Sequence, residues 1–365
     1  MKKFLLIFLS VVLASFPVHA GPAGYQDLFD EYMAAQSGLQ EQRSRYDALV
    51  EGYEQALHAV RGMSSFSTDE FSVSNMLINK GLGSLRLGWG IDRAREACLS
   101  GRALAEISFR NTYKNLHDLE KARTASLEAY EAGTKAYDAK TLLHGNGLLS
   151  GQDLRIAAYQ LEMLHADMLA RERAYHRQLR LFNLELSKDY ETPHEWVLRE
   201  EMMPVAALSD YLGNALAHSP ELNELRRKIE ENRLVVGTIA MYRTHLSYYA
   251  AGQTYRQAVI DLNIADIMLK AGEGRLAREL ERGYEDLKIS REELALSALQ
   301  VEILRQQSLR MMESHRLGYV DRTSADQALV NYEKALEGHA ASIHSYNTRV
   351  LSYERNAAWF MKGDL

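Results

Sequence analysis

The residue patterns that most often carry chemistry are sparse in this chain of 365 residues. Residues 272–277, Gly-Glu-Gly-Arg-Leu-Ala, match the spacing of a dinucleotide-binding fingerprint. That fingerprint also needs a following βαβ unit, whereas a long helical pattern follows here, so no dinucleotide site is expected. The 12 histidines are scattered and form no HExxH motif. The closest pair on one predicted helix, His339 and His344, is expected to be solvated.

Nucleophilic, redox and nucleic-acid chemistry are no better supported. The single cysteine, Cys98, excludes intramolecular disulfides, Cys-rich zinc sites and thiol-pair redox chemistry, and among Ala and Leu it is expected to be a packing residue. A formal charge of −6 with both signs mixed along the chain argues against nucleic acid as a partner. We therefore expect a protein that is not an enzyme, with no catalytic residues, no metal site and no cofactor.

The elements that position the remaining candidate residues are long helices. The five prolines lie at positions 17, 22, 193, 204 and 220, so residues 23–192 and 221–365 contain none. Mixed α/β proteins turn many corners and use prolines to do so. Leu280, Leu287 and Leu294 repeat every seven residues, which is typical of coiled-coil-like packing. The sequence predicts a mainly α fold of long, antiparallel, coiled-coil-like helices.

The N-terminus has the features of an export signal. Two lysines precede the apolar run 4–13, and Val18 and Ala20 supply small residues before a cleavage point. This pattern predicts a signal peptide over residues 1–20, removed after Ala20. A transmembrane anchor is the alternative, but it needs about 20 apolar residues, more than this run offers.

The mature chain reads as two copies of one plan, residues 21–187 and 205–365, joined by a polar linker at 188–204. Gly147 and Gly318 interrupt helical patterns 171 residues apart, and Tyr175 and Tyr346 follow them at the same distance. A duplicated unit explains these offsets better than chance similarity between helices.

Two segments, 64–91 and 243–268, lose helical periodicity and are predicted to be β-hairpins. Within them, 84–91 and 260–265 alternate apolar with polar or small residues, as a barrel strand between lipid and water requires. An amphipathic strand on a soluble helical body is the alternative. Four strands per chain cannot close a barrel, so closure would require several chains. The residues expected to face lipid are Leu85, Leu87, Trp89, Ile260, Leu262 and Ile264.

The breaks at 144–151 and 317–323 are predicted to be the tips of helical hairpins. Gly147 and Gly318 end long helices, where a left-handed residue is commonly needed. Ordinary hairpin turns would explain the glycines alone. They would not explain why apolar residues stand at turns that should be polar, namely Leu148, Leu149, Tyr319 and Val320.

The order of these motifs resembles the TolC family of outer-membrane efflux proteins. Residues 215–222, Ala-Leu-Ala-His-Ser-Pro-Glu-Leu, resemble the start of the family's repeat, and 259–274 resemble its last strand with the Gly-rich entry to the long helix. Asn146-Gly-Leu148 with Asp153, and residues 317–320, are similar to its two periplasmic turns.

This resemblance implies a homotrimer in the outer membrane, in which four strands per chain form one twelve-stranded barrel continued by a periplasmic helical tunnel. It implies the channel component of a tripartite efflux or type I secretion system, in contact with outer-membrane lipid and a periplasmic adaptor (membrane fusion) protein, and served indirectly by an inner-membrane pump. A periplasmic coiled-coil scaffold without a pore is the alternative. By resemblance the apolar tips would dock the adaptor, and a tunnel gate would use Asp153, Asp321, Arg322 and Asp326.

Overall fold

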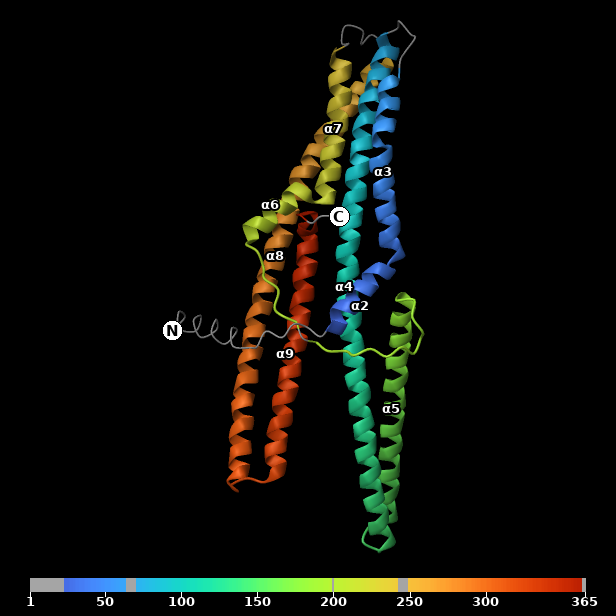
Figure 1. Cartoon of the computed structure of the whole chain (residues 1–365). Coiled ribbons are helices and arrows are strands. Elements are labelled where there is room, and N and C mark those ends of the chain that lie inside the picture. The colour runs from blue at the N-terminus through green and yellow to red at the C-terminus, as the bar shows by residue number, and fades with distance from the viewer. Residues whose placement is uncertain (1–22, 64–69, 199, 242–248, 363–365) are drawn as a thin grey trace, which may run out of the picture. The chain divides into compact units, whose positions relative to one another are not determined.

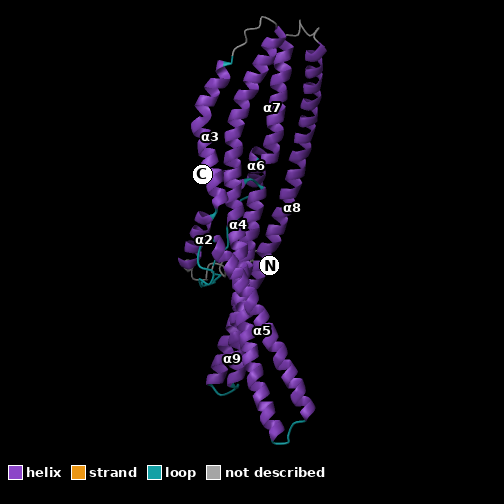
Figure 2. Cartoon of the chain, turned by 90° about the vertical axis from the view of Figure 1, so that its right-hand side faces the viewer, coloured by secondary structure: helices purple, strands orange, loops and turns teal. Residues whose placement is uncertain are grey.

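The computed structural model describes residues 23–63, 70–198, 200–241 and 249–362, and all regular structure in these ranges is helical (Figure 1 and Figure 2). The predicted signal peptide lies outside them. The elements are α2 (Ala23–Ala35), α3 (Ser37–Gly62), α4 (Glu70–Gly145), α5 (Gly151–Glu185), α6 (Leu208–His218), α7 (Pro220–Met241), α8 (Tyr249–Arg316), α9 (Arg322–Asn356) and the 3₁₀ turn η2 (Trp359–Lys362).

The predicted dominance of long helices is confirmed. Helices α4 and α8 have 76 and 68 residues, and each is followed by a 35-residue helix, α5 or α9. Figure 1 shows each long helix and its successor as an antiparallel hairpin. Within the described ranges, none of the helices has the length and apolar character needed to cross a membrane.

The predicted strands are wrong wherever the structure describes them. Residues 70–91 belong to α4 and residues 249–268 to α8. Positions 64–69 and 243–248, which complete the two predicted hairpins, lie outside the described residues. The six residues assigned to lipid-facing strands are therefore helical: Leu85, Leu87, Trp89, Ile260, Leu262 and Ile264.

Helical spacing explains why residues 84–91 belong to α4. Apolar residues at Ile78, Leu82, Leu85 and Trp89 follow steps of four, three and four, which keep them on one side of a helix. Ile78 and Leu82 are buried together with Ile239 of α7. The alternation over 84–91 covers too short a window to separate the two periods, and the longer pattern with its buried face prevails.

The same spacing recurs in α8. Ala258, Leu262, Ala265 and Leu269 repeat the steps of four, three and four, and both alanines are buried. Ile260, which the alternation placed on the same face as Leu262, is half exposed instead. A helix separates residues two apart onto different sides, so the strand assignment grouped residues that do not share a face.

The described chain forms two compact units, each built from segments of both halves. Unit 1 contains α2, residues 106–202 with the second part of α4 and α5, and residues 293–348 from α8 and α9. Unit 2 contains α3, the first part of α4, α6, α7, the first part of α8 and the C-terminal end. The predicted duplication remains a prediction about sequence, and these units do not coincide with its repeats.

In unit 2, α4 and α7 are joined by a ladder of ion pairs. Arg86 pairs with Glu231, and seven residues later Arg93 pairs with Glu224 at 2.7 Å. A third pair, Arg227 with Glu96 at 3.1 Å, is buried. Breaking a buried pair by removing one partner leaves an uncompensated charge and costs several kcal/mol, whereas exposed pairs contribute under about 1 kcal/mol. The ladder therefore fixes the register of two antiparallel helices through one buried contact.

In unit 1, aromatic side chains bind the non-helical residues after α5 to the helices. Phe109, Tyr113 and Phe182 are completely buried. The Tyr113 hydroxyl accepts a hydrogen bond from the backbone N–H of Val197 at 2.9 Å, and the Trp196 indole N–H donates to the Tyr175 hydroxyl at 3.2 Å. The stretch expected to be a polar linker is thus part of the core of this unit.

A buried carboxylate, Glu200, lies at the end of that stretch. Arg110 of α4 donates to Glu200 Oε2 at 2.7 Å, and Asn347 Nδ2 of α9 donates to the same oxygen at 2.9 Å. His344 contacts Glu200 Oε1 through Nδ1 at 2.8 Å and the Arg110 carbonyl through Nε2 at 2.9 Å. We call these four residues the Glu200 cluster.

Charge and hydrogen bonding reverse the effect of burial on Glu200. Burial raises the pKa of its carboxyl, but the hydrogen bond from His344 and the charge of Arg110 lower it further, to about 2. His344 and His339, which we expected to be solvated, are both buried. Each faces the inside of α9, where a partner from elsewhere in the chain satisfies its ring.

The first prediction tests the helical assignment of residues 258–267. Spin labels placed singly along this segment should show greatest solvent accessibility at Ile260, Ile264 and Ile267 and least at Ala258 and Ala265, because exposure follows helical spacing. Electron paramagnetic resonance with a soluble relaxation agent measures this. An accessibility that alternates at every second residue would restore the strand.

The second prediction concerns Glu200→Gln. The stabilisation by this carboxylate is full above its unfolded pKa of 4.5 and is lost as the pH falls toward about 2. The substitution should lower the free energy of unfolding at pH 7 by on the order of 3 kcal/mol and remove that acid dependence. Chemical denaturation at several pH values measures both.

The matched control is Glu302→Gln. The pKa of Glu302 is also lowered to about 2, by hydrogen bonds from Arg305 and Gln306, but that pair lies at the surface of α8. Its loss should change stability by less than about 1 kcal/mol. Equal effects of the two substitutions would mean that burial of the Glu200 cluster is not what stabilises unit 1.

Candidate functional site

The two hairpin turns of unit 1 share one backbone conformation. Helix α4 ends at Gly145 and α5 begins at Gly151, while α8 ends at Arg316 and α9 begins at Arg322. Gly147 has a φ of +73° and Gly318 a φ of +78°. The predicted left-handed residues are confirmed at both turns, where a side chain would be strained.

Each turn is closed by the hydrogen bonds of a Schellman motif. The N–H of Leu148 donates to the carbonyl of Leu143 at 2.9 Å, and the N–H of Tyr319 donates to that of Ser314 at 2.9 Å. The amide of each left-handed glycine also donates to a histidine carbonyl, that of His144 or His315, at 2.9 Å. These bonds satisfy carbonyls that the end of a helix otherwise leaves free.

The side chains of the same two histidines reach across their turns. His144 Nδ1 lies 2.8 Å from the carbonyl oxygen of Leu149, and His315 Nδ1 lies 3.1 Å from that of Val320. The two histidines are 171 residues apart, as are the two glycines. Sequence analysis missed both residues, although the shared offset was a signal that could have identified them.

The next helix of each hairpin begins with a side-chain cap, with the residue types exchanged. Ser150 Oγ accepts from the N–H of Asp153 at 3.1 Å in the first turn, and Asp321 Oδ1 accepts from the N–H of Ser324 at 2.9 Å in the second. The hydrogen bonds from Ser324 lower the pKa of Asp321. Ser150 and Ser324 were not among the predicted residues, and the same offset relates them to Asp321 and Asp153.

The four charged residues predicted for a gate therefore have local partners. Asp153 and Asp321 take part in helix caps, and Arg322 pairs with Asp326 at 3.4 Å on the exposed first turn of α9. An exposed pair of this kind adds little to stability. These groups are available for other interactions at a small energetic cost.

The apolar tip residues face outward. Leu148 is 73% exposed and Tyr319 is 80% exposed, while Leu149 and Val320 are half-buried beside them. Leu142 and Leu317, on either side of the two turns, are also exposed. We use the name docking tips for residues 142–149 and 317–320. Each turn is fully hydrogen-bonded, so nothing in its folding requires this apolar exposure.

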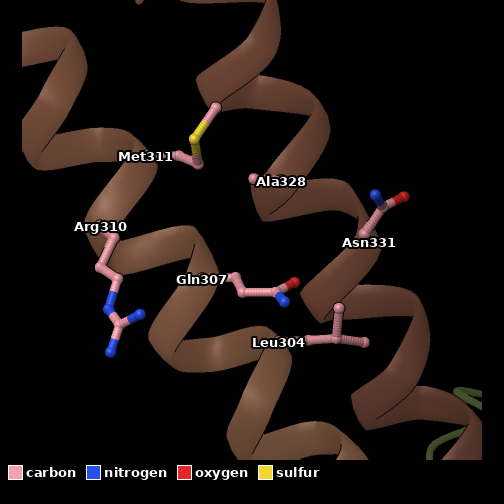
Figure 3. Close-up of a pocket in the computed structure, with 6 residues that line it drawn as sticks. All are labelled: Leu304, Gln307, Arg310, Met311, Ala328 and Asn331. Carbon is pink, nitrogen blue, oxygen red and sulfur yellow. The ribbon is translucent and has the colours of Figure 1, made fainter.

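The stems of the two hairpins differ. In the first, a Cβ on Gly133 of α4 would lie 2.5 Å from Leu164 Cδ1, so the helices are in close contact there. In the second, α8 and α9 leave a groove of about 270 Å³. Figure 3 shows Gln307 and Met311 extending from α8 toward α9 and Arg310 pointing away. The remaining lining residues are Leu304, Ala328 and Asn331.

Unit 1 also carries two exposed apolar stripes with the same spacing. On α8 the stripe lies opposite the buried side that includes Ala298 and Val301. Residues three and seven positions after the first member of a stripe lie on one side of a helix. The stripe members are Leu296, Leu299 and Ile303 on α8, and Ile156, Tyr159 and Met163 on α5.

Other chemistry-bearing patterns have structural roles in the described part of the chain. Residues 272–277 lie inside α8, so their glycines form no phosphate-binding turn. Cys98 is buried, as expected for a packing residue. The Ser297 hydroxyl, 2.6 Å from His339, donates to the Leu294 carbonyl, as a structural serine does. No group of three or more potential metal ligands occurs within the described ranges.

Comparison with known proteins identifies the fold. No protein-family model matches the chain, and no curated protein does. Among solved structures, the CmeC outer-membrane channel of Campylobacter jejuni aligns at 11% identity over 94% of this chain and 90% of that one, with a TM-score of 0.55. The outer-membrane protein VceC of Vibrio cholerae aligns at 12% identity over 93% and 96%, with a TM-score of 0.53.

CusC, a protein that forms a transmembrane channel, aligns at 10% identity over 94% of this chain and 95% of that one, with a TM-score of 0.57. These alignments span nearly the whole chain, including both hairpins and both units. The chain therefore has the TolC-type fold of the outer-membrane efflux channels.

Proposed function

We propose that this chain is the outer-membrane channel component of a tripartite efflux or type I secretion system. It would pass substrate from an inner-membrane pump and a periplasmic adaptor to the exterior, as a conduit and without catalysis. The fold of outer-membrane channels supports this proposal. The observation that carries it is the pair of docking tips, whose turns expose Leu148 and Tyr319 although their backbones are complete.

The docking tips are the surface that meets the adaptor in this proposal. An exposed apolar side chain next to a rigid turn gives a partner helix a contact that excludes water without first ordering a loop. Leu148 and Leu149 supply this contact at one tip, and Tyr319 and Val320 at the other. The groove of the second hairpin adds an apolar recess lined by Leu304 and Met311.

The apolar stripes of α5 and α8 support assembly as a homotrimer. Apolar residues at positions i, i+3 and i+7 of an exposed helix side are typical of a helix that packs against another helix. The chain covers one side of α8 itself and leaves the other exposed. We propose that the stripe on α5 of one copy meets the stripe on α8 of the next.

The charged residues beyond the tips would form the gate of the tunnel. Arg322 and Asp326 are paired and exposed, so this ion pair can exchange partners between chains. Asp153 and Asp321 would add carboxylates at the mouth and favour cations there. Their hydrogen bonds at the helix caps fix the positions of those charges.

A periplasmic coiled-coil scaffold without a pore is the second candidate. It is favoured by one observation, namely that residues 84–91 and 260–265 are helical. The two candidates predict different locations for the protein. The channel is expected in the outer-membrane fraction as trimers that dissociate on heating in detergent, and recovery in the soluble periplasmic fraction would favour the scaffold.

The docking prediction uses Leu148→Asp combined with Tyr319→Asp. Efflux of a fluorescent dye, from cells that also express the adaptor and pump of the same organism, should fall at least about tenfold, because a charge is desolvated at the contact. Trimers should still assemble, since both side chains are exposed. Leu184→Asp, an equally exposed leucine on α5 away from the tip, should leave efflux unchanged.

A second comparison separates docking from gating. Arg322→Ala with Asp326→Ala should raise leak conductance in a planar bilayer while dye efflux persists, because the pair lies beyond the docking residues. Normal efflux by the Leu148 and Tyr319 variant would refute the docking assignment. An unchanged conductance of the charge variant would place the gate elsewhere.

A further inference from the structure

We propose that His144 and His315 are positioning residues that hold the two docking tips in shape by stapling each turn across its apolar residues. This inference rests on the proposed function, because it specifies how the same tips are prepared for a partner. Neither histidine need touch the partner itself. Each acts through the backbone that carries Leu148 or Tyr319.

The hydrogen-bond geometry defines the staple. The carbonyl oxygens of Leu149 and Val320 can only accept, so the Nδ1 atoms of His144 and His315 must donate to them. In both tips the histidine stands three residues before the left-handed glycine and five before the carbonyl that it binds. The arrangement has therefore formed twice, at one offset.

The staple closes the part of the turn that the other bonds leave open. In the first tip, the Schellman motif fixes the backbone up to Leu148, and the cap of Ser150 fixes it from Asp153 onward. The carbonyl of Leu149 lies between these two locks. The ring of His144 binds this carbonyl, so Leu148 is held on a backbone that is fixed on both sides.

The second tip repeats the arrangement with different residues. Tyr319 follows the Schellman bond, Asp321 provides the cap, and His315 binds the carbonyl of Val320 between them. The exposed side chains differ, leucine in one tip and tyrosine in the other, whereas the staple is the same. The histidine thus serves the backbone shape of the turn and is independent of the apolar residue presented.

The staple has a spectroscopic signature. A neutral histidine that donates from Nδ1 carries its proton there and leaves Nε2 as the unprotonated nitrogen, because the hydrogen bond of one nitrogen sets the tautomer of the ring. Both histidines lie in exposed tips, where nothing else in the described structure imposes this tautomer. Nitrogen-15 NMR of histidine-labelled protein distinguishes it from the Nε2–H form.

The test compares His144→Leu with His315→Leu against His144→Gln with His315→Gln. Leucine cannot donate, whereas the glutamine amide can reach the same carbonyl and should restore the staple. His58→Leu, at an exposed position on α3, is the control. Spin labels at Leu148→Cys and Tyr319→Cys report the mobility of each tip without any partner, and binding to the purified adaptor is measured separately.

The proposal expects Nδ1–H signals that disappear in the leucine pair, mobile labels in that pair alone, and adaptor affinity reduced about tenfold or more, with recovery in the glutamine pair. Helix content and trimer formation should not change. Nε2–H tautomers in the unmodified protein, or label mobility equal in the leucine pair and the unmodified protein, would overturn the staple.

Unchanged adaptor affinity despite mobile tips would overturn the positioning role. Failure of the proposed function has a different result: the unmodified protein itself would bind no adaptor although its tips are immobile and the Nδ1–H signals are present. That result would refute positioning for docking and leave the staple as a feature of the turn.

Discussion

The hydrogen-bonded carboxylate of Glu200 is the interaction on which unit 1 depends. It belongs to a segment without helix or strand, yet it receives donors from α4 through Arg110 and from α9 through His344 and Asn347. Connecting segments normally run over the surface, because their backbone groups need water. Here Tyr113 and the Glu200 cluster supply the missing partners, so the segment can be buried between helices from the two halves of the chain.

Local patterns allowed the helical part of the fold to be predicted from sequence. The absence of proline, the apolar spacing of α8 and the glycines at the two turns each act over a few residues, and the structure agrees with them. The predicted strands failed for a related reason. Residues 84–91 satisfy both periods, and only the burial of Ile78 and Leu82, a turn or two earlier, identifies the helix.

The buried polar residues could not be predicted in this way. His344 lies 144 residues from Glu200 and 234 from the Arg110 carbonyl that its ring contacts. No spacing within α9 reveals such partners, so a histidine on a helix rich in polar residues was expected to be solvated. The tip histidines differ, since His144 and His315 have local roles and equal offsets. They were accessible to sequence reasoning, but the analysis followed the glycines and the apolar residues.

The ion-pair ladder between α4 and α7 restricts how unit 2 can move. Arg86 and Arg93 meet Glu231 and Glu224 in one antiparallel alignment, and a shift of one heptad would retain at most one of these pairs. Such a shift would also separate Arg227 from Glu96 and leave two buried charges uncompensated. Sliding of one helix along the other is therefore opposed at every step, whereas a small change in crossing angle keeps all three pairs near their partners. Tilting is the inexpensive displacement for this pair of helices, and any widening of unit 2 is expected to proceed by rotation about the buried Arg227–Glu96 contact.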